Sequence, residues 1–277
     1  MTIGEAIRAA AERLAATSDT ARLDAELLMA HLEGVSRSEL LLYRLREPAP
    51  PGFAALVERR MTHEPVAYIT GRQEFCGLPL RVTPATLIPR GDSETLVEAA
   101  LALKPDALRV LDLGTGSGAL LLAVLAHCGA AQGVGLDRSE AALDVARSNA
   151  ESLGLRPQAR FETGDWHAAG WADDLGTFDL VLCNPPYVEA DAALDRQVQA
   201  FEPASALFAG PEGLDDYRVL IPQLRALMNP GAGAILEIGA NQADAVAALA
   251  DAAGFSTELR RDLAGRARAL VLRVRTT

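Results

Sequence analysis

Residues Asn184, Pro185, Pro186 and Tyr187 form a loop that is rich in hydrogen-bond acceptors and follows an apolar run, 178–183. The two prolines fix φ and remove two N–H donors, so the loop presents carbonyl oxygens. The Asn184 side chain adds another carbonyl oxygen, and Tyr187 adds an aromatic plate. A planar group with two N–H donors, either a carboxamide or an exocyclic amine, matches this set. The four residues are therefore predicted to be catalytic and substrate-binding, with a plain strand-ending turn as the alternative.

The chemistry that such a loop favours is group transfer to nitrogen. An amide nitrogen is a weak nucleophile because its lone pair is delocalised into the carbonyl group. Fixed acceptors on both N–H bonds can aim that nitrogen at an electrophile, and orientation of this kind can lower a barrier by as much as ~7–11 kcal/mol. Acceptor dipoles also stabilise the positive charge that grows on nitrogen. No strong base is needed before transfer, which agrees with a sequence that lacks a clustered His/Asp pair.

A second loop, made of Gly114, Thr115, Gly116, Ser117 and Gly118, joins an apolar run to a helical pattern. Glycines let the backbone approach a ligand closely, and open α/β sheets bind ligands where such loops follow strands. The spacing is neither that of a dinucleotide fingerprint nor that of a P-loop. These residues are predicted to bind a cofactor, and a tight strand-to-helix turn is the alternative.

Acidic residues follow the next two predicted strands. Asp137 comes 21 residues after Gly116, where a carboxylate can accept both hydroxyls of a ribose; alternatively it only favours the next helix, which Ser139 is better placed to cap. Asp165 could accept from an adenine amino group beside Trp166, although a loop turn and a core aromatic are alternatives. Contacts to ribose and adenine, without a pyrophosphate site, predict S-adenosyl-L-methionine as the cofactor.

Strands and helices alternate around these loops from residue 109 onward. The predicted strands are 109–113, 133–137, 160–163, 178–183, 234–238 and 269–274. The predicted helices between them are 119–127, 139–152, 215–228 and 242–253. Strands separated by helices indicate an α/β fold with a doubly wound, mostly parallel sheet that is covered on both faces.

The first part of the chain has a different character. Residues 1–73 predict a small all-α helical bundle, with a capping box at Thr2 and Glu5 and a helix stop at Gly34. Residues 66–88 are rich in β-forming side chains, and Gly77 separates two strand-like runs. We therefore expect three parts, which are a helical domain over 1–73, a β-hairpin linker over 74–88 and an α/β domain over 89–277.

Composition limits the classes of function. The chain has 277 residues, 49% of them hydrophobic, and a formal net charge of −11, which disfavours unaided binding to nucleic acid or to an anionic membrane. The three cysteines and four histidines lack metal-ligand spacing, so no metal is expected. No secretory signal and no run of ~18 apolar residues is visible. We expect a cytoplasmic protein.

Several motifs together resemble the peptide chain release factor N5-glutamine methyltransferase family. Besides the two loops and the helical first part, the resemblance rests on residues 71–90, which connect the helical part to the α/β part and are called the connector below, and on one later segment. These motifs are Gly71-Arg72-Gln73-Glu74-Phe75, Gly77-Leu78-Pro79-Leu80, Leu87-Ile88-Pro89-Arg90 and Phe201-Glu202-Pro203. The loop at 184–187 alone is shared with enzymes that methylate amino groups of DNA and RNA, so the connector discriminates better.

The resemblance implies a Rossmann-like methyltransferase sheet and methylation of the glutamine in the Gly-Gly-Gln loop of class I peptide chain release factors. It implies cofactor contacts from residues 114–118, Asp137, Trp166 and Asn184, glutamine contacts from residues 184–187, and a pocket shaped by Phe75 and Arg90. The helical domain would help to hold the release factor. We expect a monomer whose partner is this protein substrate, with no direct nucleic acid and no membrane.

Alternatives and two departures accompany this interpretation. A glutamine of a ribosomal protein, a nucleic-acid exocyclic amine, and a non-catalytic cofactor-binding role are the competing functions. Gly91 stands where the family leads us to expect a proline, and the segment Gly265–Arg268 lacks an expected acidic residue. Both departures are expected to lie far from the chemistry and to affect the grip on substrate.

Overall fold

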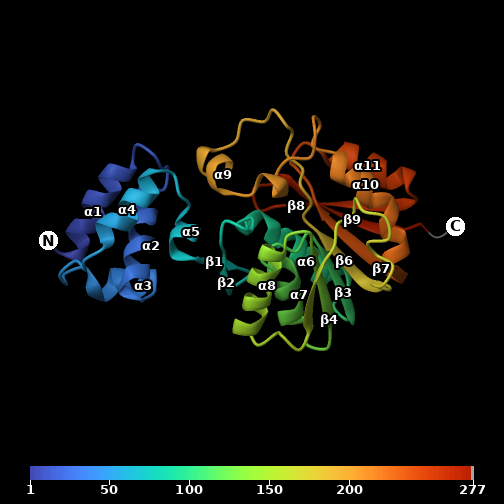
Figure 1. Cartoon of the computed structure of the whole chain (residues 1–277), viewed down its shortest axis with the longest axis horizontal. Coiled ribbons are helices and arrows are strands. Elements are labelled where there is room, and N and C mark those ends of the chain that lie inside the picture. Colours follow the sequence, from blue (N-terminus) through green and yellow to red (C-terminus); the bar gives the residue numbers. More distant parts are fainter. Residues whose placement is uncertain (276–277) are drawn as a thin grey trace. The chain divides into compact units, whose positions relative to one another are not determined.

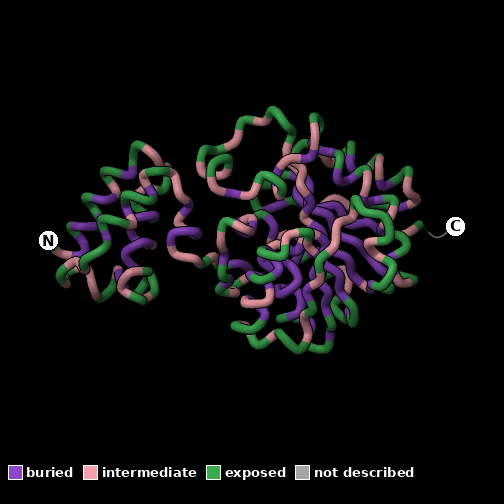
Figure 2. The backbone as a smooth tube through the Cα atoms, viewed as in Figure 1, coloured by how far each residue is buried: buried purple, intermediate pink, exposed green. Residues whose placement is uncertain are grey.

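The computed structural model describes residues 1–275, and the chain divides into two compact units (Figure 1). The first unit consists of Met1–Arg72 together with Leu194–Glu202, and the second consists of Gln73–Ala193 together with Pro203–Thr277. Buried residues follow the strands and the inner sides of the helices in the second unit (Figure 2). Each unit is described separately below.

The first unit is helical, as the sequence predicted. Its elements are α1 (Ile3–Leu14), α2 (Ala21–Glu33), α3 (Arg37–Glu39), the π-helical turn η1 (Leu40–Arg44), α4 (Phe53–Met61), α5 (Val66–Thr70) and α9 (Arg196–Phe201). The capping box at α1 is confirmed, because the Thr2 side chain accepts from the Glu5 N–H and the Glu5 side chain accepts from the Thr2 N–H. Gly34 ends α2 at φ 66°, a left-handed conformation that glycine adopts readily.

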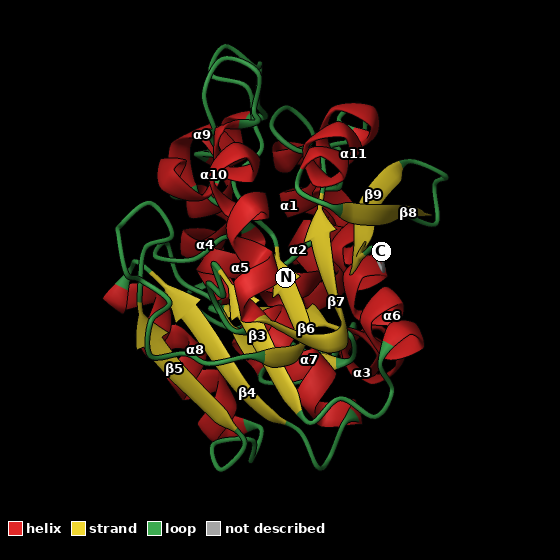
Figure 3. Ribbon diagram, turned by 90° about the vertical axis from the view of Figure 1, so that its right-hand side faces the viewer, coloured by secondary structure: helices red, strands yellow, loops and turns green. Residues whose placement is uncertain are grey.

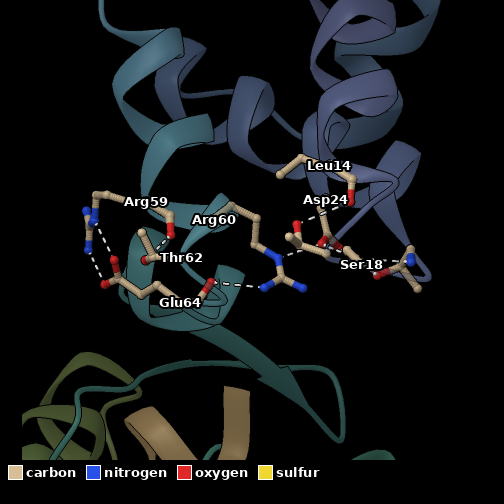
Figure 4. Close-up of polar contacts among 9 residues, drawn as sticks. Leu14, Ser18, Asp24, Arg59, Arg60, Thr62 and Glu64 are labelled. Atoms are coloured by element: carbon tan, nitrogen blue, oxygen red, sulfur yellow. Dashed lines mark hydrogen bonds and ion pairs between the residues drawn. The ribbon is translucent and has the colours of Figure 1, made fainter. Parts of the chain in front are cut away.

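A buried ion pair joins α2 to α4 (Figure 4). Arg60 Nε donates to Asp24 Oδ2 over 2.7 Å, and the exposed fractions of the two side chains are only 6% and 7%. The hydroxyl groups of Ser18 and Thr20 donate to the same carboxylate. The Asp24 charge is thus fully hydrogen-bonded, which is what burial of a carboxylate requires.

The β-rich interpretation of residues 66–88 is wrong at its start. Val66–Thr70 forms α5, because Pro65 precedes it, Gly71 ends it at φ 70°, and Ile69 packs into the core of the helical unit. Tertiary packing therefore overrides the local preference of this segment for strands. The hairpin that follows consists of β1 (Arg72–Phe75) and β2 (Leu78–Arg81).

The hairpin turn needs positive φ at both central residues. Cys76 and Gly77 have φ values of 49° and 74°, which is the twist that two-residue hairpins favour. The Asn149 side chain in α8 holds the second strand, since its Oδ1 accepts from the Arg81 N–H and its Nδ2 donates to the Arg81 carbonyl. The hairpin is therefore fastened to the α/β unit.

The second unit contains a mostly parallel sheet with the strand order β5-β4-β3-β6-β7-β9-β8 (Figure 3). Its strands are β3 (Arg109–Leu113), β4 (Gln132–Asp137), β5 (Ala159–Thr163), β6 (Phe178–Cys183), β7 (Met228–Glu237), β8 (Phe255–Arg261) and β9 (Ala267–Val274). Its helices are α6 (Glu94–Leu103), α7 (Ala119–His127), α8 (Glu140–Ser152), α10 (Asp215–Leu224) and α11 (Ala243–Ala252), with 3-10 turns at Gly91–Ser93, Ala204–Ala206 and Arg225–Leu227.

The predicted fold class is confirmed, since helices cover both faces of this sheet. Side chains of α6, α7 and α8 pack with Val110, Leu180 and Leu182 on one face. Side chains of α10 and α11 pack with Leu111 and Val181 on the other. The alternation along each strand fills both layers, as in doubly wound sheets. Strand β8 was not predicted, because this edge strand exposes several of its polar side chains and gives no apolar run.

Candidate active site

The two predicted loops begin side by side at one edge of the sheet. Strands β3 and β6 are parallel neighbours, and Leu113 is paired with Cys183, so Gly114 and Asn184 both start where paired strands end. A Cβ placed on Gly114 would lie 3.9 Å from the Asn184 carbonyl oxygen. Strand order reverses between β3 and β6, since β4 and β5 lie on one side and β7 on the other. Open α/β sheets bind ligands at such a switch point.

The glycine loop adopts left-handed conformations that explain its composition. Gly114, Gly116 and Gly118 have φ values of 71°, 55° and 81°, which side chains with a Cβ rarely adopt. A Cβ on Gly114 would also lie 3.2 Å from the ring of Trp166. The loop is therefore shaped by its glycines and lies directly against the predicted adenine-side tryptophan.

Asp137 holds the glycine loop to the end of β4. Its Oδ2 accepts from the Gly116 N–H over 2.9 Å, and its Oδ1 accepts from the Ser139 N–H over 2.9 Å. Ser139 itself caps α8 through the Ala142 N–H. Each carboxylate oxygen can accept more than one hydrogen bond, so Asp137 keeps acceptor capacity beyond these backbone contacts.

A second carboxyl group lies buried beneath the loop. Asp112 is 1% exposed, and its Oδ2 accepts from Thr115 Oγ1 over 2.6 Å. Its Oδ1 has no hydrogen-bond partner among the described residues. Burial raises the pKa of Asp112 from 3.8 to about 7, the Thr115 hydroxyl opposes this rise, and the nearby Asp137 charge adds to it. Desolvation is thus the dominant cause.

Trp166 and Asp165 follow β5, and Asp216 at the start of α10 fixes the tryptophan. Trp166 Nε1 donates to Asp216 Oδ1 over 2.8 Å, and His167 Nε2 lies 3.0 Å from the same oxygen. Asp165 Oδ1 accepts from the His167 N–H. The indole is therefore held by its polar edge while its ring lies against Gly114.

One cavity of about 590 Å³ connects the two halves of the site. Its wall includes both connector residues, Phe75 and Arg90, and most of the predicted site residues. Among the described residues, the predicted positions that do not line it are Gly118, Pro185 and Tyr187. Gly118 lies under the loop, where a Cβ would come within 3.0 Å of Leu122. The volume falls in the range of small-molecule sites.

The residues of the loop at 184–187, called the reactive loop below, face different surroundings. The Asn184 side chain borders the cavity and makes no hydrogen bond within residues 1–275. Pro185 is buried, whereas Pro186 borders the cavity. The Tyr187 hydroxyl donates to Glu237 Oε1 over 3.2 Å. Asn184 is thus the side chain of this loop with free acceptor capacity at the cavity.

The sequence interpretation assigned no role to three side chains that organise the site. Asp216 holds Trp166, while Glu237 and Gln242, at and just beyond the end of β7, hold Tyr187. The sequence did contain one indication for Glu237, because an acidic residue at the end of an apolar, buried strand is unusual. Asp216 and Gln242 carried none, because their partners are distant in sequence.

Neither family departure lines the cavity itself, although Gly91 directly follows Arg90, which does. Gly91 belongs to the 3-10 turn Gly91–Ser93, and Ser93 lines the cavity. Arg268 lies 3.0 Å from Asp92 Oδ2 and 3.5 Å from Asp262 Oδ2. Burial lowers the pKa of Arg268, but the neighbouring Tyr187 and Glu237 together with Asp92 and Asp262 outweigh it and raise the pKa. Folding brings the start of β9 beside the turn Gly91–Ser93, although the two segments are far apart in the sequence.

The site carries no signature of a metal centre. Within residues 1–275, no group of three or more His, Cys, Asp or Glu side chains could hold a metal ion. The three cysteines are unpaired thiols, and burial raises the pKa of Cys76 to about 12. No helix of the described chain has both the length and the apolar character needed to cross a membrane.

The residues present fit a nucleoside cofactor. The loop backbone is open to close approach because its glycines carry no Cβ, and Asp137 retains acceptor capacity beside it. Residues 104–251 match the family described as a methyltransferase domain, and residues 5–71 match the one described as the PrmC N-terminal domain. The fold and the site define an S-adenosyl-L-methionine-dependent methyltransferase.

Relatives of known family resemble the chain over most of its length. It is 44% identical over 261 residues to the release factor glutamine methyltransferase of Rhodospirillum rubrum, covering 92% of this chain and 79% of that protein. It is 43% identical to the one of Cereibacter sphaeroides, covering 99% of both chains, and 41% identical to the one of Caulobacter vibrioides, covering 94% and 91%. The chain belongs to the release factor glutamine methyltransferase family.

Proposed function

We propose that this enzyme methylates the side-chain amide nitrogen N5 of the glutamine in the Gly-Gly-Gln motif of class I peptide chain release factors. The observation that carries the proposal is the Asn184 side chain, which borders the cavity without a hydrogen-bond partner in the described chain. Residues of the glycine loop line the same cavity. The names of the relatives support the choice of protein substrate.

Within this proposal, the loop at 184–187 binds and orients the glutamine amide. Asn184 Oδ1 and a backbone carbonyl oxygen of the loop accept its two N–H bonds, so the nitrogen lone pair faces the cofactor side. The prolines remove competing donors, and the acceptor dipoles stabilise positive charge that develops on the nitrogen. Pro186 closes the wall, and Tyr187 anchors the end of the loop.

The remaining site residues hold the cofactor and the substrate backbone. When bound, S-adenosyl-L-methionine supplies an activated methyl group. Residues 114–118 let it approach the backbone, Asp137 accepts its ribose hydroxyls, and Asp165 and Trp166 border its adenine. Phe75 and Arg90 shape the entrance that receives the glutamine. The helical unit recruits the release factor.

Methylation of a purified class I release factor tests this proposal. The enzyme, labelled cofactor and release factor are incubated together, and mass spectrometry of the digest is expected to locate one added methyl on the glutamine of the Gly-Gly-Gln peptide. Parallel reactions contain ribosomal proteins or nucleic acid. Label that enters only one of those substrates, with none on the release factor, would contradict the proposal.

A further inference from the structure

The side-chain hydroxyl and the backbone carbonyl of Tyr187 are both hydrogen-bonded to residues at or just beyond the carboxyl end of β7. Its hydroxyl donates to Glu237 Oε1 over 3.2 Å, and its backbone carbonyl accepts from Gln242 Nε2 over 3.0 Å. Its N–H donates to the Leu207 carbonyl over 3.1 Å. The side chain and the main chain of the last loop residue are therefore both hydrogen-bonded to the surrounding structure.

Both supports are themselves fixed. Glu237 is 2% exposed, and its backbone carbonyl accepts from the hydroxyl of the fully buried Tyr217 over 2.6 Å. Gln242 is oriented through its Oε1, which accepts from the Gly239 N–H over 3.0 Å. Its Nε2 also lies 3.2 Å from the Gly213 carbonyl oxygen. The two residues that hold Tyr187 are therefore themselves hydrogen-bonded to other parts of the second unit.

Gly213 packs closely against the main chain of Tyr187. This residue has φ 65°, and a Cβ on it would lie 2.2 Å from the Tyr187 carbonyl oxygen. The loop backbone is therefore in direct contact with the turn that precedes α10. Interiors packed this closely transmit small displacements instead of absorbing them.

Glu237 is shielded from bulk solvent and has a charged neighbour. Burial raises its pKa, whereas Ser93 and the charge of Arg268 lower it to a smaller extent. Arg268 is in turn paired with Asp92 and Asp262. One Glu237 oxygen thus accepts from Tyr187, whereas the other, Oε2, is buried without a hydrogen-bond partner among the described residues.

We propose that Glu237 and Gln242 are positioning residues for methyl transfer, which act by fixing Tyr187 and thereby the acceptor oxygens of residues 184–186. This inference rests on the proposed function of the loop. The role of Glu237 is to accept a hydrogen bond and does not require its charge. A misplacement of about 1 Å at a reacting group can cost about 10²-fold in rate, so loosening Tyr187 is expected to lower kcat much more than cofactor affinity.

Three substitutions separate this role from others. Glu237→Gln keeps an acceptor for the tyrosine hydroxyl, Glu237→Leu removes it, and Gln242→Glu replaces the donor to the Tyr187 carbonyl by an acceptor. Measured on the release factor, kcat is expected to stay within about threefold for Glu237→Gln and to fall about 10²-fold for the other two. The dissociation constant of the cofactor, from calorimetry, is expected to change by less than about threefold in all three.

A double mutant shows whether Glu237 acts through Tyr187. Because Tyr187→Phe removes the same hydrogen bond, adding Glu237→Leu to it should produce little further loss. Fully additive losses would overturn the proposal, as would a loss of rate in Glu237→Gln as large as in Glu237→Leu, which would indicate that the charge or a proton is needed. A parallel loss of cofactor affinity would indicate a support of the whole fold instead.

Hydrogen exchange, which needs no substrate, tests the positioning role independently of the proposed function. The N–H groups of Tyr187 and Val188 both donate to the Leu207 carbonyl, so hydrogen exchange in a peptide over 186–190 reports how firmly the loop is held. Exchange is expected to be about tenfold faster in Glu237→Leu and Gln242→Glu than in the wild type. Unchanged exchange would overturn the positioning role even if the release factor is not the substrate. Wild-type enzyme that fails to methylate the release factor would contradict only the proposed function.

Discussion

Neutralising Asp112 should remove a pH dependence from the stability of the methyltransferase unit. The side chain is 1% exposed, one oxygen has no partner among the described residues, and burial raises its pKa from 3.8 to about 7. A shift of about three pKa units corresponds to about 4 kcal/mol between the two protonation states. Because the group is fully buried, solvent screening reduces this figure little.

The direction follows from the raised pKa. Between about pH 4 and pH 7 the folded state keeps the Asp112 proton while the unfolded state has released it, so stability falls as pH rises through this window. The stabilisation is complete below the unfolded pKa and is lost as pH passes the folded one. From pH 5 to pH 7.5 we expect wild-type protein to lose about 2–3 kcal/mol through this residue. Asp112→Asn should not lose it.

Tryptophan fluorescence during urea unfolding measures this effect in the right part of the chain. Both tryptophans, Trp166 and Trp171, belong to the second unit. The difference in unfolding free energy between wild type and Asp112→Asn is measured without cofactor at several pH values. Asp144→Asn, whose side chain is 72% exposed, is the matched control. Parallel curves for wild type and Asp112→Asn between pH 5 and pH 7.5 would refute the reasoning.

Further substitutions test the other parts of the molecule. Asn184→Ala should lower kcat about 10²–10³-fold, as does loss of one preorganised hydrogen-bonding group, with a smaller change in the cofactor dissociation constant; wild-type turnover would contradict the amide-binding role. Asp137→Ala should weaken cofactor binding by about 1–3 kcal/mol in calorimetry, and unchanged affinity would remove the ribose assignment. Asp24→Ala leaves Arg60 buried and uncompensated, so protection of α2 and α4 from hydrogen exchange should fall by about 3–5 kcal/mol. Deleting residues 1–73 should leave cofactor binding intact and weaken methylation of the whole release factor, and normal processing would contradict the recruiting role.

Much of the α/β unit could be predicted because its signals are local. The apolar runs 109–113 and 178–183 coincide with β3 and β6, and the run at 119–127 coincides with α7. Gly114 and Asn184 directly follow the two strand runs, so the apolar pattern and the residues that interrupt it agree on where each strand ends. Parallel pairing then places the ends of β3 and β6 together, which is why two loops 70 residues apart could be assigned to one site.

The features that escaped prediction depend on contacts between distant residues. The side chain of Tyr187 was expected to form a plate beside the substrate, whereas its hydroxyl lies on Glu237, 50 residues later. Asp216 meets Trp166 across a similar separation. The residues that surround each partner in the sequence give no indication that the two will meet. The segment 66–70 was misassigned for the same reason, since its helix depends on burial of Ile69 in the helical unit.

The way the chain leaves and re-enters the methyltransferase unit bears on how the truncation must be interpreted. All residues that line the cavity belong to the second unit, so chemistry and recruitment are separable in principle. However, residues 194–202 group with the helical unit, and they lie between Tyr187 and Leu207, whose backbones are hydrogen-bonded to each other. A deletion of 1–73 therefore frees a segment that is close to the reactive loop along the chain.

A second variant that also replaces 194–202 by a glycine–serine linker is needed. If both variants methylate an isolated Gly-Gly-Gln peptide equally well but fail on the whole release factor, the loss belongs to recruitment; if only the simple deletion loses activity on the peptide, the freed segment disturbs the loop.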